Sequence, residues 1–281
     1  MVLSQALSTA RRRSVARARR GRAPWQLRVP ATVAAIFLIL PLLALVIRAP
    51  WRALPSLLGD PLVGEALRLS LLCATTAAGL SALFGIPLAW LLARSNGSVA
   101  TVIRALVTIP LVLPPVVGGV ALLSAFGRRG LLGRPVDELF GIALPFTPLG
   151  VIVAETFVAM PFLVLTVEGA FRTLDDGYAE AAATLGAGPW FAFRRVVVPL
   201  LAPALMAGTV LAWARALGEF GATITFAGNS PGRTQTMPLA VYLAMERDPD
   251  AAVALSLILL LVSIVVLVAL RGRWLTGLGG R

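Results

Sequence analysis

The sequence predicts an all-α membrane protein with six transmembrane helices, and two observations support this fold class. Hydrophobic residues make up 58% of the 281 residues and charged residues 14%, with a mean hydropathy of +0.88, whereas soluble domains carry about 25% charged residues. Four windows, at residues 29–47, 69–93, 105–127 and 251–270, contain no charged side chain. Each is close to the ~20 residues that a helix needs to cross the hydrocarbon core.

Two further spans carry charges. The window at residues 145–171 is apolar apart from Glu155 and Glu168, and the window at 196–227 is apolar apart from Arg215 and Glu219. Lipid offers no partner to backbone N–H and C=O groups, and all six windows are longer than the ~10 alternating residues of a barrel strand. We therefore expect six helices.

The arginines predict the orientation of these spans. With both termini in the cytoplasm, the cytoplasmic segments hold sixteen arginines and the outer segments eight, as the positive-inside rule requires. The predicted organisation is a basic cytoplasmic tail at residues 1–28, a first span with its outer loop at 29–63, a core at 64–270 and a cytoplasmic tail at 271–281. The loop that follows the fourth span then faces the cytoplasm.

The basic N-terminus has two other interpretations. The net charge of +12 could indicate nucleic-acid binding, but eight arginines lie in the first 28 residues, just before a span, where membrane topology explains them. The Arg-rich start and the apolar run could also be a cleaved signal peptide. We favour a retained first span, because the run is long and no clear small-x-small cleavage site follows it.

The sequence lacks the residues that several kinds of functional site need. The sequence contains no Lys, so it encodes no Walker A loop, and ATP must be handled by another chain. It contains no His, and Cys73 is the single cysteine, most simply a small packing residue; neither a zinc site nor a disulfide framework is expected. The charges in the spans do not lie beside a candidate nucleophile. We expect no enzyme active site, no metal and no cofactor.

The predicted cytoplasmic loop has a distinctive pattern, EAAATLGAGPWFAFRRVVVP at residues 180–199. Its alanines favour a short helix, and Asp175 and Asp176 suit the start of that helix. Gly186 and Gly188, followed by Pro189, favour a turn into a second helix. The apolar side chains that follow, Trp190, Phe191 and Phe193, would suit a partner's groove or the membrane interface.

This pattern resembles the EAA loop of the permease subunits of bacterial ABC importers. The resemblance implies the type I importer (MetI-like) permease fold and a pair of coupling helices that dock onto a separate ATPase. It implies that the coupling residues are Glu180, Ala181, Ala182, Gly186 and Pro199. The alternative is an ordinary surface helix that links two spans.

A second constellation, ARALGEFGAT at residues 214–223, lies in the fifth span. Arg215 and Glu219 are four residues apart, so on a helix they share one face and can pair, and Thr223 continues that face. A lone charge at bilayer depth costs on the order of 3 kcal/mol. The pair either lines the path of an anionic substrate or braces neighbouring helices, and Glu155 is a further candidate whose counter-ion could be Arg215.

The stretch at 214–223, together with LPPVVGG at 113–119, TFVAMPF at 156–162 and GRTQTMPLAVY at 232–242, resembles the permeases of molybdate ABC transporters. Sulfate and thiosulfate permeases are close relatives and are the alternative. The resemblance implies uptake of molybdate, and of tungstate if selectivity allows, by a homodimer of permease subunits with an ATPase dimer and a periplasmic or surface binding protein.

Two other classes remain as rivals. An ion-coupled secondary transporter would lack the coupling loop and would often show an inverted repeat. A membrane-embedded enzyme would need a reactive cluster. Prolines inside the predicted spans, at positions 87, 110, 114, 115 and 161, predict kinks that serve either motion or plain helix bending.

Overall fold

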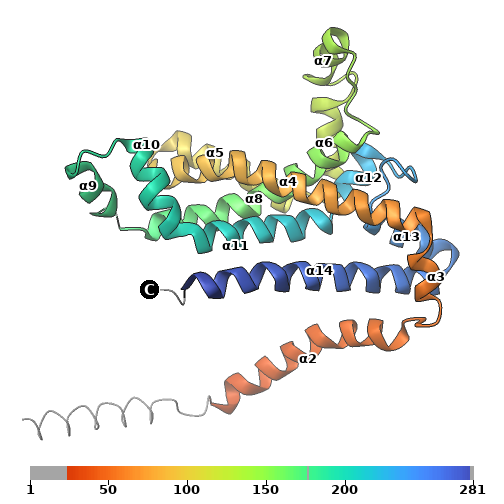
Figure 1. Ribbon diagram of the computed structural model, residues 1–281. Coiled ribbons are helices and arrows are strands. Elements are labelled where there is room, and N and C mark those ends of the chain that lie inside the picture. Colours follow the sequence, from red (N-terminus) through yellow and green to blue (C-terminus); the bar gives the residue numbers. More distant parts are fainter. Residues whose placement is uncertain (1–23, 176, 279–281) are drawn as a thin grey trace, which may run out of the picture. The chain divides into compact units, whose positions relative to one another are not determined.

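The computed structural model describes residues 24–175 and 177–278, and most of these residues lie in helices (Figure 1). The chain forms two compact units, one that ends at Arg48 and one that begins at Ala49. Five helical stretches of the described chain are long and apolar enough to span a membrane: α2 (Trp25–Arg48), α4 (Pro61–Arg94), α8 (Pro148–Thr173), the stretch Pro189–Leu217, and α14 (Pro249–Leu278) up to Ala269. They match the first, second, fourth, fifth and sixth predicted spans.

The N-terminal unit contains α2. This helix begins at Trp25, four residues before the predicted span, and none of its residues is buried within the chain. A helix that is apolar on all sides and that buries nothing requires an apolar surrounding. A transmembrane role fits this requirement. Most of the predicted basic tail, residues 1–23, lies outside the described residues.

The predicted third span, residues 105–127, is not one helix. It divides into α5 (Ser98–Val112) and α6 (Pro115–Phe126), of about 22 Å and 18 Å at ~1.5 Å per residue, each too short to cross ~30 Å of hydrocarbon. Two prolines cause the break, because Pro114 confines Leu113 to extended backbone (ψ 134°) and neither proline ring nitrogen can donate a helical hydrogen bond. Pro87, Pro110 and Pro161 lie inside continuous helices.

The predicted fifth span also ends early. The helical stretch begins before the predicted window of 196–227, with α10 (Pro189–Ala192) and a π-helical turn (Phe193–Val197), and continues as α11 (Val198–Leu217). Residues 218–220 then leave the helix and α12 (Gly221–Ala227) begins. Gly218 and Gly221 weaken the helix here. The Glu219 side chain also accepts a backbone hydrogen bond from Ala222, which offers the chain an alternative to a continuous helix.

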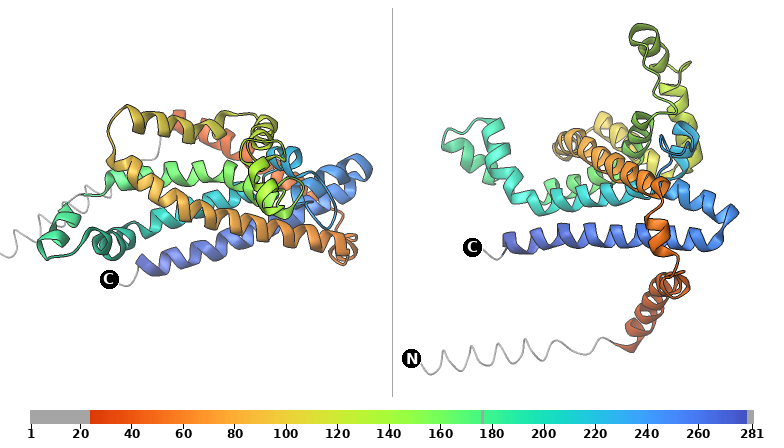
Figure 2. Two further views of the ribbon diagram at one scale, coloured as in Figure 1. Left: turned by 90° about the horizontal axis from the view of Figure 1, so that it is seen from above. Right: turned by 45° about the vertical axis from the view of Figure 1, so that its right-hand side comes forward.

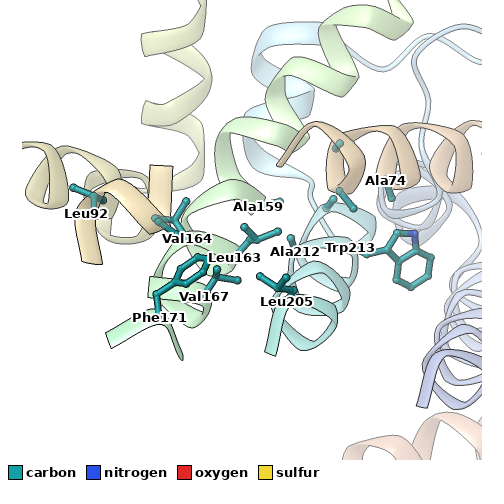
Figure 3. Close-up of a cluster of buried hydrophobic side chains, with 14 of the residues drawn as sticks. Ala74, Leu92, Ala159, Leu163, Val164, Val167, Phe171, Leu205, Ala212 and Trp213 are labelled. Carbon is teal, nitrogen blue, oxygen red and sulfur yellow. The ribbon is translucent and has the colours of Figure 1, made fainter. Parts of the chain in front are cut away.

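The core lies where α4, α8 and α11 pack side by side (Figure 1). Small residues on α4 and α11, such as Ala74 and Ala212, belong to the same buried cluster as the larger Leu163, Val164 and Val167 of α8, and Figure 3 shows Ala212 beside Leu163. Gly208 brings α11 close to α8, since a Cβ there would lie 3.0 Å from a methyl group of Val167. Small residues of this kind let helix backbones approach each other within a membrane.

Short helices complete the second unit. They are α3 (Leu54–Leu58), α7 (Gly133–Phe140), α9 (Gly177–Thr184) and α13 (Met237–Arg247). Residues 231–234 form a turn, with φ +71° at Gly232. The loop then joins α13 to α4 through a hydrogen bond from the Met237 N–H to Ser70 Oγ of 2.7 Å. Figures 1 and 2 show α6 and α7 standing across the direction of the long helices.

Candidate functional site

The predicted pair of Arg215 and Glu219 forms, although Glu219 lies just beyond the end of α11. Arg215 Nη2 is 2.6 Å from Glu219 Oε2, and Glu219 Oε1 accepts a hydrogen bond from the Ala222 N–H at 2.8 Å. The Glu219 side chain is 1% exposed and that of Arg215 is 29% exposed. Glu219 therefore connects the end of α11 to the first turn of α12 and also fixes the guanidinium.

The exposed part of Arg215 faces a small pocket between α5, α6, α8 and α11. The pocket has a volume of about 150 Å³, room for about five water molecules at ~30 Å³ each. Arg215 is the single charged residue among the described residues that line it; the others are Pro110, Leu111, Leu113, Pro115, Gly118, Phe157, Val158 and Phe162. Glu219 Oε2 contacts Nη2, and a guanidinium carries five N–H donors, so donors remain for an anion.

The structure does not bring Thr223 or Glu155 into this pocket. Thr223 lies fully buried in α12, and its hydroxyl has no hydrogen-bond partner among the described residues. Glu155 is 1% exposed on α8, and within the described chain its Oε2 has no hydrogen-bond partner. The counter-ion of Arg215 is Glu219 rather than Glu155. Cys73 packs among buried apolar side chains, as expected.

One wall of the pocket is fixed by two close backbone approaches between α6 and α12. A Cβ added at Gly119 would lie 2.5 Å from the Thr225 Cβ, and a Cβ added at Gly221 would lie 2.4 Å from the Pro115 Cβ. Neither neighbour has a flexible side chain that could move aside. The position of α6 over Arg215 therefore depends on both glycines.

We expect Gly221→Ala to displace α6 and to destabilise the protein. Forcing a methyl group into a closely packed contact costs about 1–3 kcal/mol, so thermal unfolding in detergent should begin at a lower temperature. Gly79→Ala is the matched control, because a Cβ at Gly79 on α4 meets no heavy atom within 4 Å. Equal melting temperatures for the two variants would contradict the close packing of Gly221 against α6.

The helix–turn–helix predicted in the loop at residues 180–199 forms as α9, a turn and α10. At the start of α9 the Asp175 carboxylate accepts a hydrogen bond from the Gly177 N–H at 2.9 Å; Asp176 lies outside the described residues. At its end the Gly186 N–H bonds to the Ala183 carbonyl and the Ala187 N–H to the Ala182 carbonyl. This is the Schellman arrangement, which needs a left-handed residue, and Gly186 supplies it with φ +82°.

The segment made of α9, the turn and α10, which we call the elbow, borders an open, mostly apolar groove of about 640 Å³. We call this groove the coupling groove. It is lined by Tyr178, Ala181, Ala182, Leu185, Gly186, Ala187, Gly188, Phe191 and Val196. Leu185 is 88% exposed and Phe191 is 58% exposed. Exposed apolar side chains gathered around a groove typically mark a contact with a protein partner.

The remaining predicted coupling residues, Glu180 and Pro199, do not line this groove. Glu180 is exposed on α9, and Pro199 is exposed in the first turn of α11. Trp190 is 70% exposed. The structure thus brings Ala181, Ala182 and Gly186 together around the groove, whereas Glu180 and Pro199 do not line it.

Phe193 was predicted to face outward, but its ring packs against the core helices. Its ring lies 5.7 Å from the Trp90 ring of α4, 6.4 Å from the Phe171 ring of α8 and 5.8 Å from the Trp190 ring, measured between centroids. Aromatic pairs at these distances contribute about 0.5–1.5 kcal/mol each beyond the area that they bury. A displacement of α10 would therefore be transmitted to α4 and α8.

A second connection at this end was not predicted from the sequence. Glu168 is 4% exposed, and its Oε1 lies 2.8 Å from Arg104 Nε and 2.8 Å from Arg172 Nη2. Arg104 Nη2 also donates to the Leu92 carbonyl. The cluster joins the end of α4, α5 and the last turn of α8. Glu168 and Arg172 are four residues apart, so their spacing could have indicated the ion pair between them.

We expect Gly186→Ala, but not Gly188→Ala, to disturb the elbow. Both positions are open, since an added Cβ meets no heavy atom within 4 Å at either. A left-handed conformation costs a residue other than glycine about 1–2 kcal/mol, and only Gly186 has positive φ; Gly188 has φ −66°. Limited proteolysis of the loop should be faster in Gly186→Ala alone. Equal rates in both variants would contradict the role of Gly186.

Comparison with known proteins identifies the family. Residues 85–276 match the model of the family described as "Binding-protein-dependent transport system inner membrane component". The chain is 48% identical over 245 residues to the molybdenum transport system permease protein ModB of Mycobacterium tuberculosis, with 87% of this chain and 92% of the relative covered. It is 39% identical over 211 residues to ModB of Escherichia coli, with 75% and 92% covered. The sulfate transport system permease protein CysT of Escherichia coli is 37% identical over 236 residues, with 83% and 85% covered.

Solved structures of ABC importers confirm the predicted fold class. A chain of a bacterial ABC transporter for the import of alginate superposes with a TM-score of 0.67 at 16% identity, covering 89% of this chain and 94% of that chain. A chain of the MetNI methionine ABC transporter, crystallised in inward-facing conformations, gives a TM-score of 0.60 at 18% identity, covering 77% and 96%. The resemblance that the sequence motifs carry is thus borne out at the level of the fold.

Proposed function

The chain belongs to the family of binding-protein-dependent transport system inner membrane components, and from this premise we propose that it is the permease subunit of an ATP-driven importer of molybdate. Its several apolar helices make it a multi-pass protein of the inner membrane. The observation that carries the substrate class is Arg215, which Glu219 fixes at the edge of a small apolar pocket. Tungstate has the same tetrahedral shape and charge and would be accepted by the same contacts.

In this proposal Arg215 and Glu219 have different tasks. Arg215 meets the anion through donors that Glu219 leaves free. Glu219 positions the guanidinium and holds α12. The pair would therefore both line the substrate path and brace the neighbouring helices. Thr223 would reach the path only after α12 moves, because its hydroxyl is fully buried.

The coupling groove supports the proposal of a separate ATPase dimer as a partner. Its residues, together with Glu180 and Pro199, would receive the ATPase in the cytoplasm. With α5 and α6 together forming one crossing, both termini would lie in the cytoplasm as well. ATP binding and hydrolysis would belong to that partner and none of the chemistry to this chain. Motion of α9 and α10 would pass to α4 and α8 through Phe193.

The outer partner would be a periplasmic or surface binding protein that delivers the oxyanion to a homodimer of this chain. The name of the matched family includes dependence on a binding protein, which supports this part of the proposal. We place the lipid bilayer around α2 and the outer sides of the long helices. The arginines of the N-terminus need no nucleic acid, since topology accounts for them.

Uptake of labelled molybdate and sulfate by cells that lack their own oxyanion permeases tests the substrate. The cells would receive this chain with its ATPase and its binding protein. We expect molybdate accumulation that excess sulfate barely reduces. Preferential sulfate accumulation would instead favour the sulfate permease alternative, which the relationship to CysT keeps as the second candidate.

A further inference from the structure

The polar loop between α12 and α13 is buried and bonded to itself. Thr234 is fully buried and Gln235 is 7% exposed. The Ser230 N–H donates to Thr234 Oγ1 at 3.0 Å, and Gln235 Nε2 donates to Asn229 Oδ1 at 2.9 Å. Buried polar groups are tolerated where they bond to one another. The first residues of the stretch at 232–242 therefore fix how the chain enters α13.

The helix α13 is anchored on two long helices of its unit. Met237 is fully buried in a cluster with Val63 of α4 and Leu255 of α14, and its N–H donates to Ser70 Oγ of α4 at 2.7 Å. In Figure 1 α12 and α13 lie together at the end of the long helices that is opposite to α9 and α10. In the proposed topology this is the outer end, so α13 is a support on the side from which the anion arrives.

The Tyr242 side chain joins α13 to the chain between α11 and α12. Its ring lies 5.1 Å from the Phe220 ring, measured between centroids, with the ring planes 50° apart. Aromatic pairs at such distances are stabilised beyond the area that they bury. The Tyr242 hydroxyl donates to the Glu246 carboxylate, one turn further along α13, and this bond raises the pKa of the phenol. The ring is thus held both by Phe220 and by its own helix.

Phe220 lies between the two elements that Glu219 connects. It precedes the first residue of α12, and its backbone (φ −130°, ψ −56°) is not helical. Glu219, the residue before it, holds Arg215 Nη2 at 2.6 Å and the Ala222 N–H at 2.8 Å. Because residues 218–220 leave the helix, helical hydrogen bonds do not fix the Glu219 backbone on both sides. A displacement of the Phe220 ring would therefore move the Glu219 carboxylate and with it the guanidinium.

We propose that Tyr242 is a positioning residue for transport, which fixes Glu219 by way of Phe220. Glu219 in turn holds the Arg215 guanidinium at the pocket. The inference rests on the proposed function, since it deepens the role given there to Arg215. Tyr242 itself does not line the pocket and would not touch the anion. Its loss would therefore lower the rate of transport and leave the capture of the anion by the binding protein unchanged.

Uptake kinetics in proteoliposomes that contain the permease, its ATPase and its binding protein test this role. Tyr242→Ala removes the ring contact. We expect the maximal rate of molybdate uptake to fall by about ten-fold or more, because a small misplacement of a positioned group can cost up to about 10²-fold. The KM for the loaded binding protein should stay the same, because the pocket lies inside the permease. Tyr242→Phe keeps the ring and should recover most of the native rate. Met245→Ala removes a 62% exposed side chain of the same helix and should transport like the native chain.

Three results would overturn the proposal. The first is a native maximal rate in Tyr242→Ala. The second is a clearly raised KM, which would make Tyr242 a contact of the binding protein. The third is an equal loss of rate in Tyr242→Phe, which would assign the effect to the hydroxyl. If Tyr242→Ala does not reach the native level in the membrane, Tyr242→Leu keeps apolar bulk without the ring and is judged by the same results.

Cys73, the single native cysteine, supplies a measurement that needs no transport. It is fully buried in a cluster with Ala227 of α12 and Val151 of α8, so a maleimide reaches its thiol faster when α12 is displaced. Labelling of Tyr242→Ala should be about five-fold faster than that of the native chain, Tyr242→Phe and Met245→Ala, because local opening becomes more frequent. Equal labelling overturns the positioning role even if the native chain imports molybdate. If the native chain imports no molybdate but Tyr242→Ala is labelled faster, the proposed function fails and the link from Tyr242 to α12 stands.

Discussion

Replacing Arg215 with Gln is expected to abolish molybdate uptake, with a loss of at least two orders of magnitude. The substitution removes the charge that meets the anion and leaves the Glu219 carboxylate buried without its partner. Breaking a buried ion pair on one side costs about 3–5 kcal/mol, and ~1.4 kcal/mol corresponds to a factor of ten. Initial rates of labelled molybdate uptake, at matched membrane levels of the chain, measure the effect.

A double variant, Arg215→Gln with Glu219→Gln, separates the two tasks of this pair. It removes both charges together, while the amide oxygen introduced by Glu219→Gln can still accept the hydrogen bond that the Ala222 N–H donates to Glu219. We expect the double variant to assemble normally and to remain inactive. Recovery of uptake would show that Arg215 is only a brace. Arg52→Gln, at an exposed position between α2 and α3, is the control for loss of a positive charge.

Leu185→Asp is expected to abolish co-purification of the ATPase without unfolding the permease. Leu185 is 88% exposed and lines the coupling groove, so a charge there disturbs no internal packing but enters the proposed interface. Truncation of a central apolar anchor in a protein interface costs about 2 kcal/mol or more, roughly thirty-fold in affinity. The amount of ATPase that the tagged permease retains would be compared with that of the native chain.

Ala183→Asp is the matched control for this experiment. Ala183 is exposed in α9, two residues before Leu185, but it does not line the groove. We expect this variant to retain the ATPase. If both variants lose the partner equally, the added charge rather than the groove is responsible, and if neither does, the groove is not the docking surface.

The membrane spans were predictable because hydrophobic length carries most of the signal. The windows at 29–47, 69–93 and 251–270 each lie within a single helix of the structure. The window at 105–127 does not form a single helix, since hydropathy does not register a backbone break. The adjacent prolines at 114 and 115 could have indicated it, because two successive residues there lack the N–H that a helix needs.

The sites were predictable where the contact is local in sequence. Arg215 and Glu219 pair as their spacing predicts, and the elbow around Gly186 forms as its glycine pattern predicts. The contact between Glu168 and Arg104 joins residues 64 positions apart, so no local pattern encodes it. The inward position of Phe193 was missed for the same reason, because its partners Trp90 and Phe171 come from other helices.

The central claim is that import by this chain is driven by ATP on a separate subunit. Proteoliposomes that contain the permease and its ATPase, with the binding protein and labelled molybdate on one side and ATP on the other, test it most directly. We expect molybdate to accumulate on the ATP side only when ATP can be hydrolysed, and not when an ion gradient is supplied in its place. Accumulation driven by an ion gradient without the ATPase would contradict the account and would make the chain a secondary transporter.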